Sequence, residues 1–280
     1  MKKTLFSIFI FMLMFSFYTP VSSMGFEPEK TEVDVPILMY HFLATDNRRP
    51  NQWKIRVEEF ESDLIALKRE NFEPVFLQDL IDFVYNGISL PEKPVVITFD
   101  DGASDFYKYA FPLLKEHNMK AVMAIIGYTA DEYSKDIEQN KYAVPNLTWD
   151  QLRELKDSGL VEIQSHSYDM HRGIGAAKKR GESIDSYRAR IFKDTAKFNE
   201  RILSELGHEP TAFIFPFGNK SESSNDILKE NGFLASLICH EEISTIRVGD
   251  PDSLFDLGRI LRSPEMSSDS MIRKIYSLGK

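Results

Sequence analysis

The sequence predicts a single α/β domain, built either as a barrel or as a wound sheet of parallel strands. From Val35 onward, short apolar runs alternate with amphipathic stretches, and no linker, low-complexity tract or repeat interrupts them. This alternation is typical of parallel strands covered by helices. In such folds the chemistry gathers at the carboxyl ends of the strands, and polar residues follow four of the predicted strands.

The first half of the domain alternates as this fold class requires. Buried strands are predicted over residues 36–40, 72–76, 94–99 and 120–126. The run 94–99 (PVVITF) is continuous and rich in β-branched residues, as expected of a strand buried on both faces. Helices are predicted where Val57, Phe60, Leu64 and Leu67 recur at helical spacing, over 77–85, and in a stretch that ends near His117.

The second half continues the same alternation. Thr148 and Gln151 form a capping box for a helix that ends near Gly159. Further helices are predicted over 189–206 and 225–231, and further strands over 160–163, 211–215 and 233–238.

The N-terminus has the pattern of an export signal. Lys2 and Lys3 precede an apolar run from Leu5 to Phe17, and small residues lead to a cleavage position after Ser23. The run of roughly 13 residues is shorter than the ~20 that a spanning helix needs, although an uncleaved anchor stays an alternative. We therefore expect a signal peptide at 1–23, a short polar tether at 24–34 and the domain at 35–280, secreted or peripherally associated with the cell surface.

Composition excludes some partners. The formal net charge of -9 argues against nucleic acid, whose phosphates favour a basic face. Cys239 is the single cysteine, so no disulfide can form within the chain, and we expect it to be a small buried hydrophobe.

The polar residues that follow strands include two adjacent carboxylates and two histidines. The side chains of neighbouring residues in an extended chain point in opposite directions, so Asp100 and Asp101 cannot easily share one role. One of them can bind a metal while the other faces the substrate as a base. His166 and His171 lie five positions apart, and two imidazoles with one carboxylate make a catalytic zinc set that leaves a position open for water.

These motifs resemble those of a known family. Residues 98–102 (TFDDG) are similar to the first motif of the polysaccharide deacetylase family (NodB homology, carbohydrate esterase family 4), and residues 166–171 (HSYDMH) to its second. The common second motif separates its histidines by four positions. The spacing of five, together with residues 38–41 (LMYH), resembles the branch that deacetylates poly-β-1,6-N-acetylglucosamine. The resemblance implies a distorted (β/α) barrel in a single domain.

The resemblance also implies roles for individual residues. One divalent metal ion, zinc, would be bound by Asp101, His166 and His171. Asp100 would be the general base, and His41 the acid that protonates the departing amine. The backbone N–H of Phe217 would contact the oxyanion. Pro216 and Tyr168 would also line the site for the substrate and its oxyanion. Trp53 is a further aromatic residue that could stack on sugar rings.

The chain departs from the family pattern in two places. No arginine lies in residues 211–218, around the third motif, so the group that orients Asp100 is open. No leucine-x-histidine motif lies near the C-terminus; Arg259 and Ile260 occupy that segment, which favours His41 as the acid.

The predicted enzyme removes N-acetyl groups from N-acetylglucosamine units of an extracellular polysaccharide. Two alternatives stay open: a deacetylase of peptidoglycan, chitin or O-acetylated xylan, and a carbohydrate-binding protein without turnover.

Overall fold

A computed structural model of the chain describes residues 30–45, 51–135 and 145–279. The predicted signal peptide and residues 24–29 of the predicted tether lie outside the described residues. Within the described part, no helix is both long and apolar enough to cross a membrane.

The first strand of the fold begins three residues before the predicted start of the domain at residue 35. Strand β1 (Glu32–Val35) pairs antiparallel with β11 (Ser244–Arg247), so residues 32–34 belong to the fold rather than to a tether. The physical reason is the alternation along β1, which buries Val33 and Val35 while Glu32 and Asp34 stay exposed.

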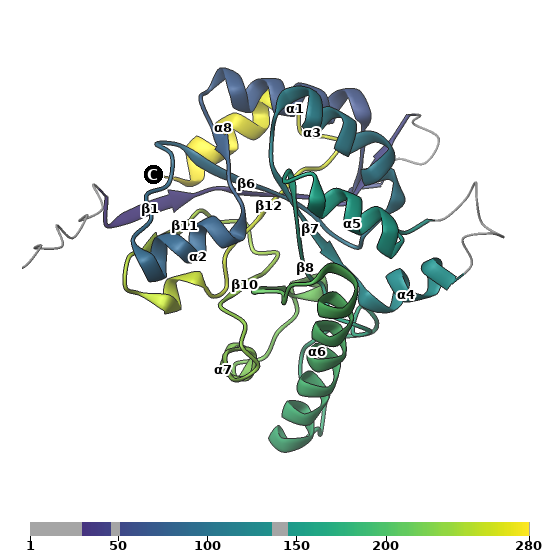
Figure 1. Cartoon of the computed structure of the whole chain (residues 1–280). Helices are drawn as coiled ribbons and strands as arrows, with labels where there is room; N and C mark the ends of the chain where they lie inside the picture. Colours follow the sequence, from purple (N-terminus) through teal and green to yellow (C-terminus); the bar gives the residue numbers. More distant parts are fainter. Residues whose placement is uncertain (1–29, 46–50, 136–144, 280) are drawn as a thin grey trace, which may run out of the picture.

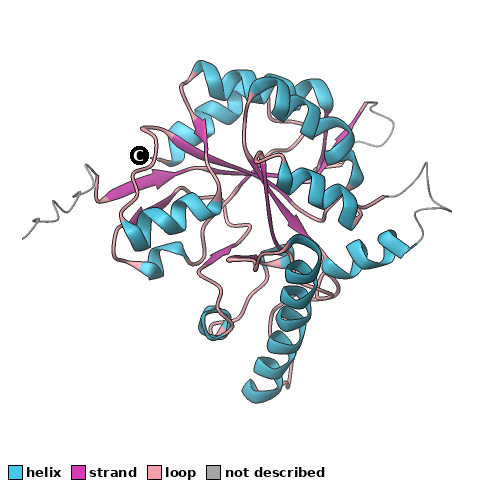
Figure 2. Ribbon diagram, in the orientation of Figure 1, coloured by secondary structure: helices cyan, strands magenta, loops and turns pink. Residues whose placement is uncertain are grey.

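The strands gather at the centre of the molecule (magenta in Figure 2). They form a parallel sheet in the order β10-β9-β8-β7-β6-β2-β12, with β5 paired to β6. Its strands are β2 (Ile37–Tyr40), β5 (Glu73–Pro74), β6 (Pro94–Phe99), β7 (Ala121–Ile125), β8 (Val161–Ser165), β9 (Ala212–Ile214), β10 (Ala235–Leu237) and β12 (Ile260–Leu261). β6 and β7 are buried along their whole length, as the apolar runs predict.

The sheet curls so that its two ends approach each other. At one end β12 pairs with β2, and just before β12 residue Leu257 forms a parallel bridge with Leu237 of β10, at the other end. This closure gathers the carboxyl ends of the strands around one rim. The predicted single α/β domain with a distorted, barrel-like sheet is confirmed.

Helices surround this sheet (Figure 1). They are α1 (Val57–Arg69), α2 (Leu77–Asn86), α3 (Phe111–His117), α4 (Gly127–Lys135), α5 (Trp149–Asp157), α6 (Ile184–Leu206), α7 (Ser224–Glu230) and α8 (Ser268–Leu278). A π-helical turn (Phe106–Ala110) leads into α3, 3-10 turns occupy Pro216–Gly218 and Pro251–Leu254, and β3 (Phe42–Ala44) pairs with β4 (Lys54–Arg56).

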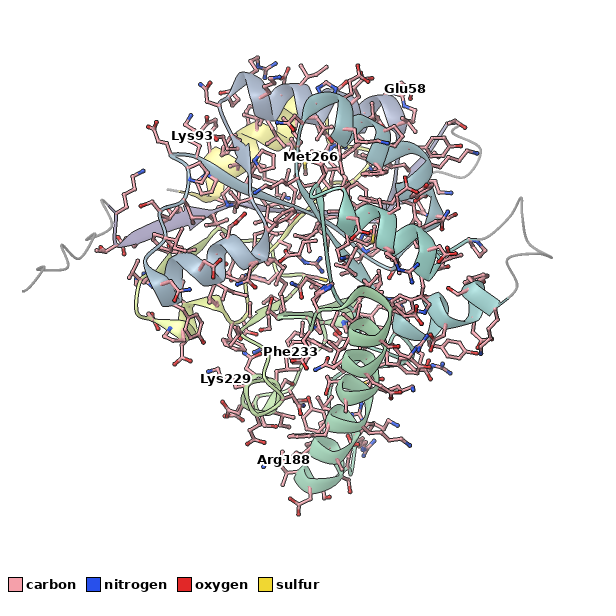
Figure 3. The ribbon with its side chains drawn as sticks, viewed as in Figure 1. Glu58, Lys93, Arg188, Lys229, Phe233 and Met266 are labelled. Carbon is pink, nitrogen blue, oxygen red and sulfur yellow. The ribbon has the colours of Figure 1, made fainter. Side chains whose placement is uncertain are left out.

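Helix α6 begins five residues before the predicted start at residue 189. Ser183 caps it, with its Oγ accepting the N–H of Ser186 at 3.2 Å, so local capping sets the start rather than apolar spacing. The helix extends away from the sheet and packs against α5 and α7 (Figure 1). Phe233 lies between α6 and α7 in a small aromatic core, whereas Arg188 lies towards the outer end of α6 (Figure 3).

Candidate active site

Strand β6 delivers a carboxylate to the inside of the curled sheet. Val95, Ile97 and Phe99 pack into the cluster shared with the surrounding helices, so the alternate residues face the other side. Thr98 and Asp100 follow that alternation, and both are buried. Asp100 is therefore held within the rim rather than exposed beside it.

Asp101 turns away from Asp100 because the chain bends there. Its φ of 72° lies in the left-handed region, which Asp tolerates better than most residues, and Gly102 follows with the same φ. Asn146 holds the bend by donating from Nδ2 to the Asp101 carbonyl oxygen at 3.0 Å. The two neighbouring carboxylates consequently have different partners.

Arg259 is the partner of Asp100. Its Nη1 lies 2.7 Å from Oδ1 and its Nη2 2.9 Å from Oδ2 of the carboxylate, and both side chains are buried. The remaining guanidinium hydrogens are also placed on acceptors: the Ile238 carbonyl at 3.1 Å, the Thr98 hydroxyl at 3.2 Å and Cys239 Sγ at 3.7 Å. A planar fork with every donor engaged fixes the orientation of Asp100.

The charge of Arg259 keeps Asp100 ionised. Burial by itself would raise the pKa of Asp100, but the adjacent guanidinium, with smaller contributions from His166 and His41, outweighs it and holds the pKa well below its usual range. The Asp100 carboxylate is therefore ionised in the free protein at neutral pH.

Asp101, His166 and His171 meet on the other side of the bend. One ligand atom from each lies within 4.8 Å of the others. His166 Nδ1 lies 2.8 Å from the Ile214 carbonyl oxygen, to which it donates, and this leaves Nε2 turned to Asp101 at 3.6 Å. His171 Nε2 lies 3.2 Å from Asp101 Oδ1.

This cluster fits a divalent cation. Asp101 Oδ1 is buried and has no hydrogen-bond partner among the residues that the structure describes. Burial and the nearby Asp100 charge, partly offset by Arg259, raise the pKa of Asp101 to about 7. Burial also lowers the pKa of His166 to about 4 and that of His171 in the same direction, so both imidazoles are neutral ligands near pH 7. A divalent cation held by these three ligand atoms would stabilise the ionised form of Asp101.

His41 lies beside Asp100. Its Nε2 is 3.9 Å from Asp100 Oδ2, and its ring packs against Trp53 with centroids 4.5 Å apart. Nδ1 is buried and accepts or donates no hydrogen bond within the described ranges. Burial, opposed by Asp100 and assisted by Arg259, lowers the pKa of His41 to about 4.

The turn that follows β9 places the aromatic ring of Phe217 beside His171. Phe217, with φ 62° and a 47% exposed surface, has its ring centroid 4.4 Å from that of His171. Gly175 packs so closely on this turn that an added Cβ would lie 2.7 Å from the Pro216 carbonyl oxygen.

This arrangement of carboxylates and histidines occurs in a region that matches a known family model. The model described as polysaccharide deacetylase matches residues 87–236, more than half of the chain. The chain belongs to the polysaccharide deacetylase family. The predicted family is thus confirmed.

Named relatives agree with the family. The poly-beta-1,6-N-acetyl-D-glucosamine N-deacetylase of Escherichia coli O157:H7 is 29% identical over 220 residues, which cover 70% of this chain and 32% of the relative. The enzyme of the same name from Staphylococcus epidermidis is 24% identical over 81% of this chain and 76% of its own. A solved de-N-acetylase from Aggregatibacter actinomycetemcomitans is 27% identical with a TM-score of 0.73, covering 86% of this chain and 100% of that one. The chain spans about a third of the length of the Escherichia coli relative.

Most of the residues singled out from the sequence converge, but Tyr168 is directed elsewhere. Its hydroxyl donates to Asp131 of α4 at 3.0 Å, and its ring packs against Gly127, where an added Cβ would lie 2.8 Å from Cδ2. The structure therefore commits the Tyr168 hydroxyl to α4 rather than to the cluster around Asp101. Cys239 is half-buried and contacts the arginine fork.

Arg259 is the functional residue that sequence reasoning missed. Analysis of the motifs left the partner of Asp100 open and noted Arg259 only as occupying a late segment. Two features of the sequence could have identified Arg259. It lies immediately before a short apolar run at residues 260–261, and residues 211–218 hold no arginine that could pair with the buried carboxylate of Asp100.

Proposed function

We propose that the deacetylase removes N-acetyl groups from N-acetylglucosamine units of an extracellular polysaccharide, poly-β-1,6-N-acetylglucosamine, with the help of one divalent metal ion, zinc. The observation that carries this proposal is the cluster of Asp101, His166 and His171 beside Asp100, which is ionised in the free protein and bound by Arg259. The names of the Escherichia coli and Staphylococcus epidermidis relatives support the choice of polymer.

Asp101 and the Nε2 atoms of His166 and His171 would hold the ion. Three protein ligands leave room for a water or substrate oxygen, which is the arrangement of a catalytic rather than a structural site. When bound, zinc polarises a carbonyl group and makes a coordinated water acidic near neutral pH.

The residues of the chain then divide the proton transfers between them. Asp100, oriented by Arg259, accepts a proton from the attacking water, and the oxygen bonds to the acetyl carbonyl carbon. The Phe217 N–H donates to the oxyanion that develops on the carbonyl oxygen. Because an amide nitrogen cannot leave as an anion, it must be protonated as its bond to carbon breaks. Acetate and a free amine are the products.

His41 is the proposed donor of that proton. Its low pKa means that it is neutral in the free enzyme, so it must first receive the proton that it delivers. Asp100 Oδ2 lies 3.9 Å from His41 Nε2, so the two side chains must approach to hydrogen-bond distance before Asp100 passes on the proton that it accepted from water. The water proton therefore reaches the amine through Asp100 and His41.

Aromatic side chains would contact the sugar rings. The Trp53 ring packs against His41, and the exposed Phe217 ring packs against His171, so one aromatic ring lies beside the proposed acid and one beside a metal ligand. Aromatic faces beside a polar centre suit the apolar faces of sugar rings. The predicted signal peptide at 1–23 places this activity outside the cytoplasm, secreted or at the cell surface.

An acetate-release assay tests the proposal. The purified full-length chain is stripped with a chelator, then restored with zinc, and incubated with poly-β-1,6-N-acetylglucosamine oligomers. Chitin oligomers, peptidoglycan and acetylated xylan are assayed in parallel. We expect zinc-dependent acetate release that is fastest on the β-1,6-linked oligomers.

The other outcomes identify the alternatives. Faster acetate release from chitin oligomers, peptidoglycan or acetylated xylan would change the proposed substrate. It would leave the proposed metal-dependent deacetylation unchanged. Retention of the glycan by the stripped protein, with no acetate released after zinc is restored, would indicate a carbohydrate-binding protein instead.

A further inference from the structure

The turn between His166 and His171 presents two successive backbone N–H groups to one carboxylate of α6. Tyr168 N lies 2.7 Å from Asp194 Oδ1, and Asp169 N lies 2.8 Å from Asp194 Oδ2. Ser167, at φ 75°, bends the chain so that both N–H groups point the same way. Consecutive N–H groups around a left-handed residue form a concave anion-binding site, which Asp194 fills.

The opposite side of the turn is held by α4. Gly127 N donates to the Ser167 carbonyl oxygen at 3.1 Å, and Tyr128 N donates to the Tyr168 carbonyl oxygen at 2.8 Å. A Cβ on Gly127 would meet the Tyr168 ring at 2.8 Å, so the turn and α4 are in close contact. The turn is therefore fixed between two helices, by N–H donors from α4 and by a carboxylate acceptor from α6.

Asp194 lies outside the metal cluster itself. The ligand atoms that approach one another belong to Asp101, His166 and His171. His171 nevertheless follows Asp169 by two residues, so the path of the turn decides where its Nε2 lies relative to His166. Removal of the carboxylate would leave the N–H groups of Tyr168 and Asp169 without their acceptor, and a turn of this kind would then rearrange.

We propose that Asp194 is a positioning residue of the metal centre: its carboxylate holds the His166–His171 turn in the shape that places both imidazoles on one ion. This inference rests on the proposed metal-dependent function. It also accounts for the five-residue spacing of the histidines, since the residues between them supply the two N–H groups that Asp194 binds.

Metal affinity and local protection test the inference together. Zinc dissociation constants are measured by competition with a chromophoric chelator for the full-length wild type, Asp194→Asn and Asp185→Asn. Asp185 is the matched control, because it lies exposed in the first turn of the same helix and its substitution removes the same charge. Loss of a group that orients metal ligands typically weakens metal binding by about 10- to 100-fold. We expect that loss in Asp194→Asn and wild-type affinity in Asp185→Asn.

Amide hydrogen exchange without metal gives the second readout. In Asp194→Asn the amide of Tyr168 or Asp169 faces the Asn NH2 group and should exchange faster, while the strand amides of β8 keep their protection. If Asp194→Asn does not fold, Asp194→Glu, which keeps both oxygens on a longer stem, is measured in the same way with the same expected directions.

The results separate the two proposals. Equal zinc affinity in wild type and Asp194→Asn would overturn the positioning role. Failure of the wild type to bind any divalent ion would overturn the proposed metal-dependent function, and the exchange rates at Tyr168 and Asp169 would still decide whether Asp194 holds the turn.

Discussion

The guanidinium of Arg259 binds both oxygens of Asp100, at 2.7 and 2.9 Å, although 159 positions separate the two residues. Breaking a buried ion pair by removing one partner costs about 3–5 kcal/mol, because the other charge is left uncompensated. The same pair is therefore important for stability and for the ionisation of the base.

Replacing Arg259 with lysine should impair catalysis more than folding. Lysine keeps the positive charge but cannot form the two-pronged contact, so Asp100 becomes misplaced and less strongly stabilised as an anion. We expect the rate of acetate release to fall by about 100-fold. Because Arg259 lowers the pKa of Asp100, its loss raises that pKa, and the acidic limb of the pH–rate profile should move to higher pH.

Arg262 provides the control for this substitution. It is equally buried and its Nε lies 2.7 Å from Asp63 Oδ2, in a second ion pair away from Asp100. Arg262→Lys should lower the melting temperature without moving the acidic limb. An unchanged limb in Arg259→Lys would show that Arg259 has no electrostatic role in the base.

The two neighbouring aspartates should fail in different ways when each is changed to asparagine. Asp100→Asn removes the base, so acetate release should fall by about 10²- to 10⁴-fold while bound zinc stays near one ion per chain. Asp101→Asn removes a ligand, so zinc should be lost first and activity with it. Metal content measured after gel filtration, together with the rate at saturating zinc, distinguishes these results; similar zinc loss in both variants would contradict the division of roles.

Zinc binding should weaken as the pH falls below 7. In the metal-free enzyme the pKa of Asp101 is raised to about 7, whereas that of His166 is lowered to about 4, so below pH 7 the proton to be displaced lies on Asp101. We expect the dissociation constant to rise about tenfold for each pH unit from 7 to 5, with about one proton released per zinc at pH 6. Calorimetry in buffers of different ionisation enthalpy measures that proton.

Asp105 tests whether the proton belongs to Asp101. Its pKa is also raised, to about 6, mainly by burial, but it accepts the Leu43 N–H and lies outside the metal cluster. Proton release in Asp105→Asn should match the wild type. If Asp105→Asn released no proton on binding zinc, the proton would come from Asp105 and not from Asp101.

His41 should matter only for substrates whose leaving group needs a proton. His41→Gln is expected to lower acetate release from N-acetylglucosamine oligomers by about 10²- to 10⁴-fold, because the amine must be protonated to depart. Hydrolysis of 4-nitrophenyl acetate, whose leaving group departs as an anion, should fall far less. Asp100→Asn should slow the hydrolysis of both substrates. If His41→Gln lowered the two rates equally, His41 would not be the acid.

Within the described part of the chain, sequence patterns predicted seven of the eight strands of the central sheet, all but β12, and the turns that carry the chemistry. The buried run of β6 was predicted with its observed bounds, and the residues that follow four strand ends meet at one rim. Local physics explains this success: β-branched apolar runs specify buried strands, and parallel strands collect their carboxyl ends on one side. The family resemblance came from the same short segments.

The tertiary structure decided everything that joins distant segments. The pairing of Arg259 with Asp100, the capture of the His166–His171 turn by Asp194, and the direction of the Tyr168 hydroxyl all depend on which helix or strand packs beside which. A buried charge takes the nearest partner that the folded chain supplies, and no local pattern encodes that distance. The sequence therefore predicted which residue types bind the metal. The groups that orient the site, Arg259 and Asp194, could be identified only from the packing of distant segments in the folded chain.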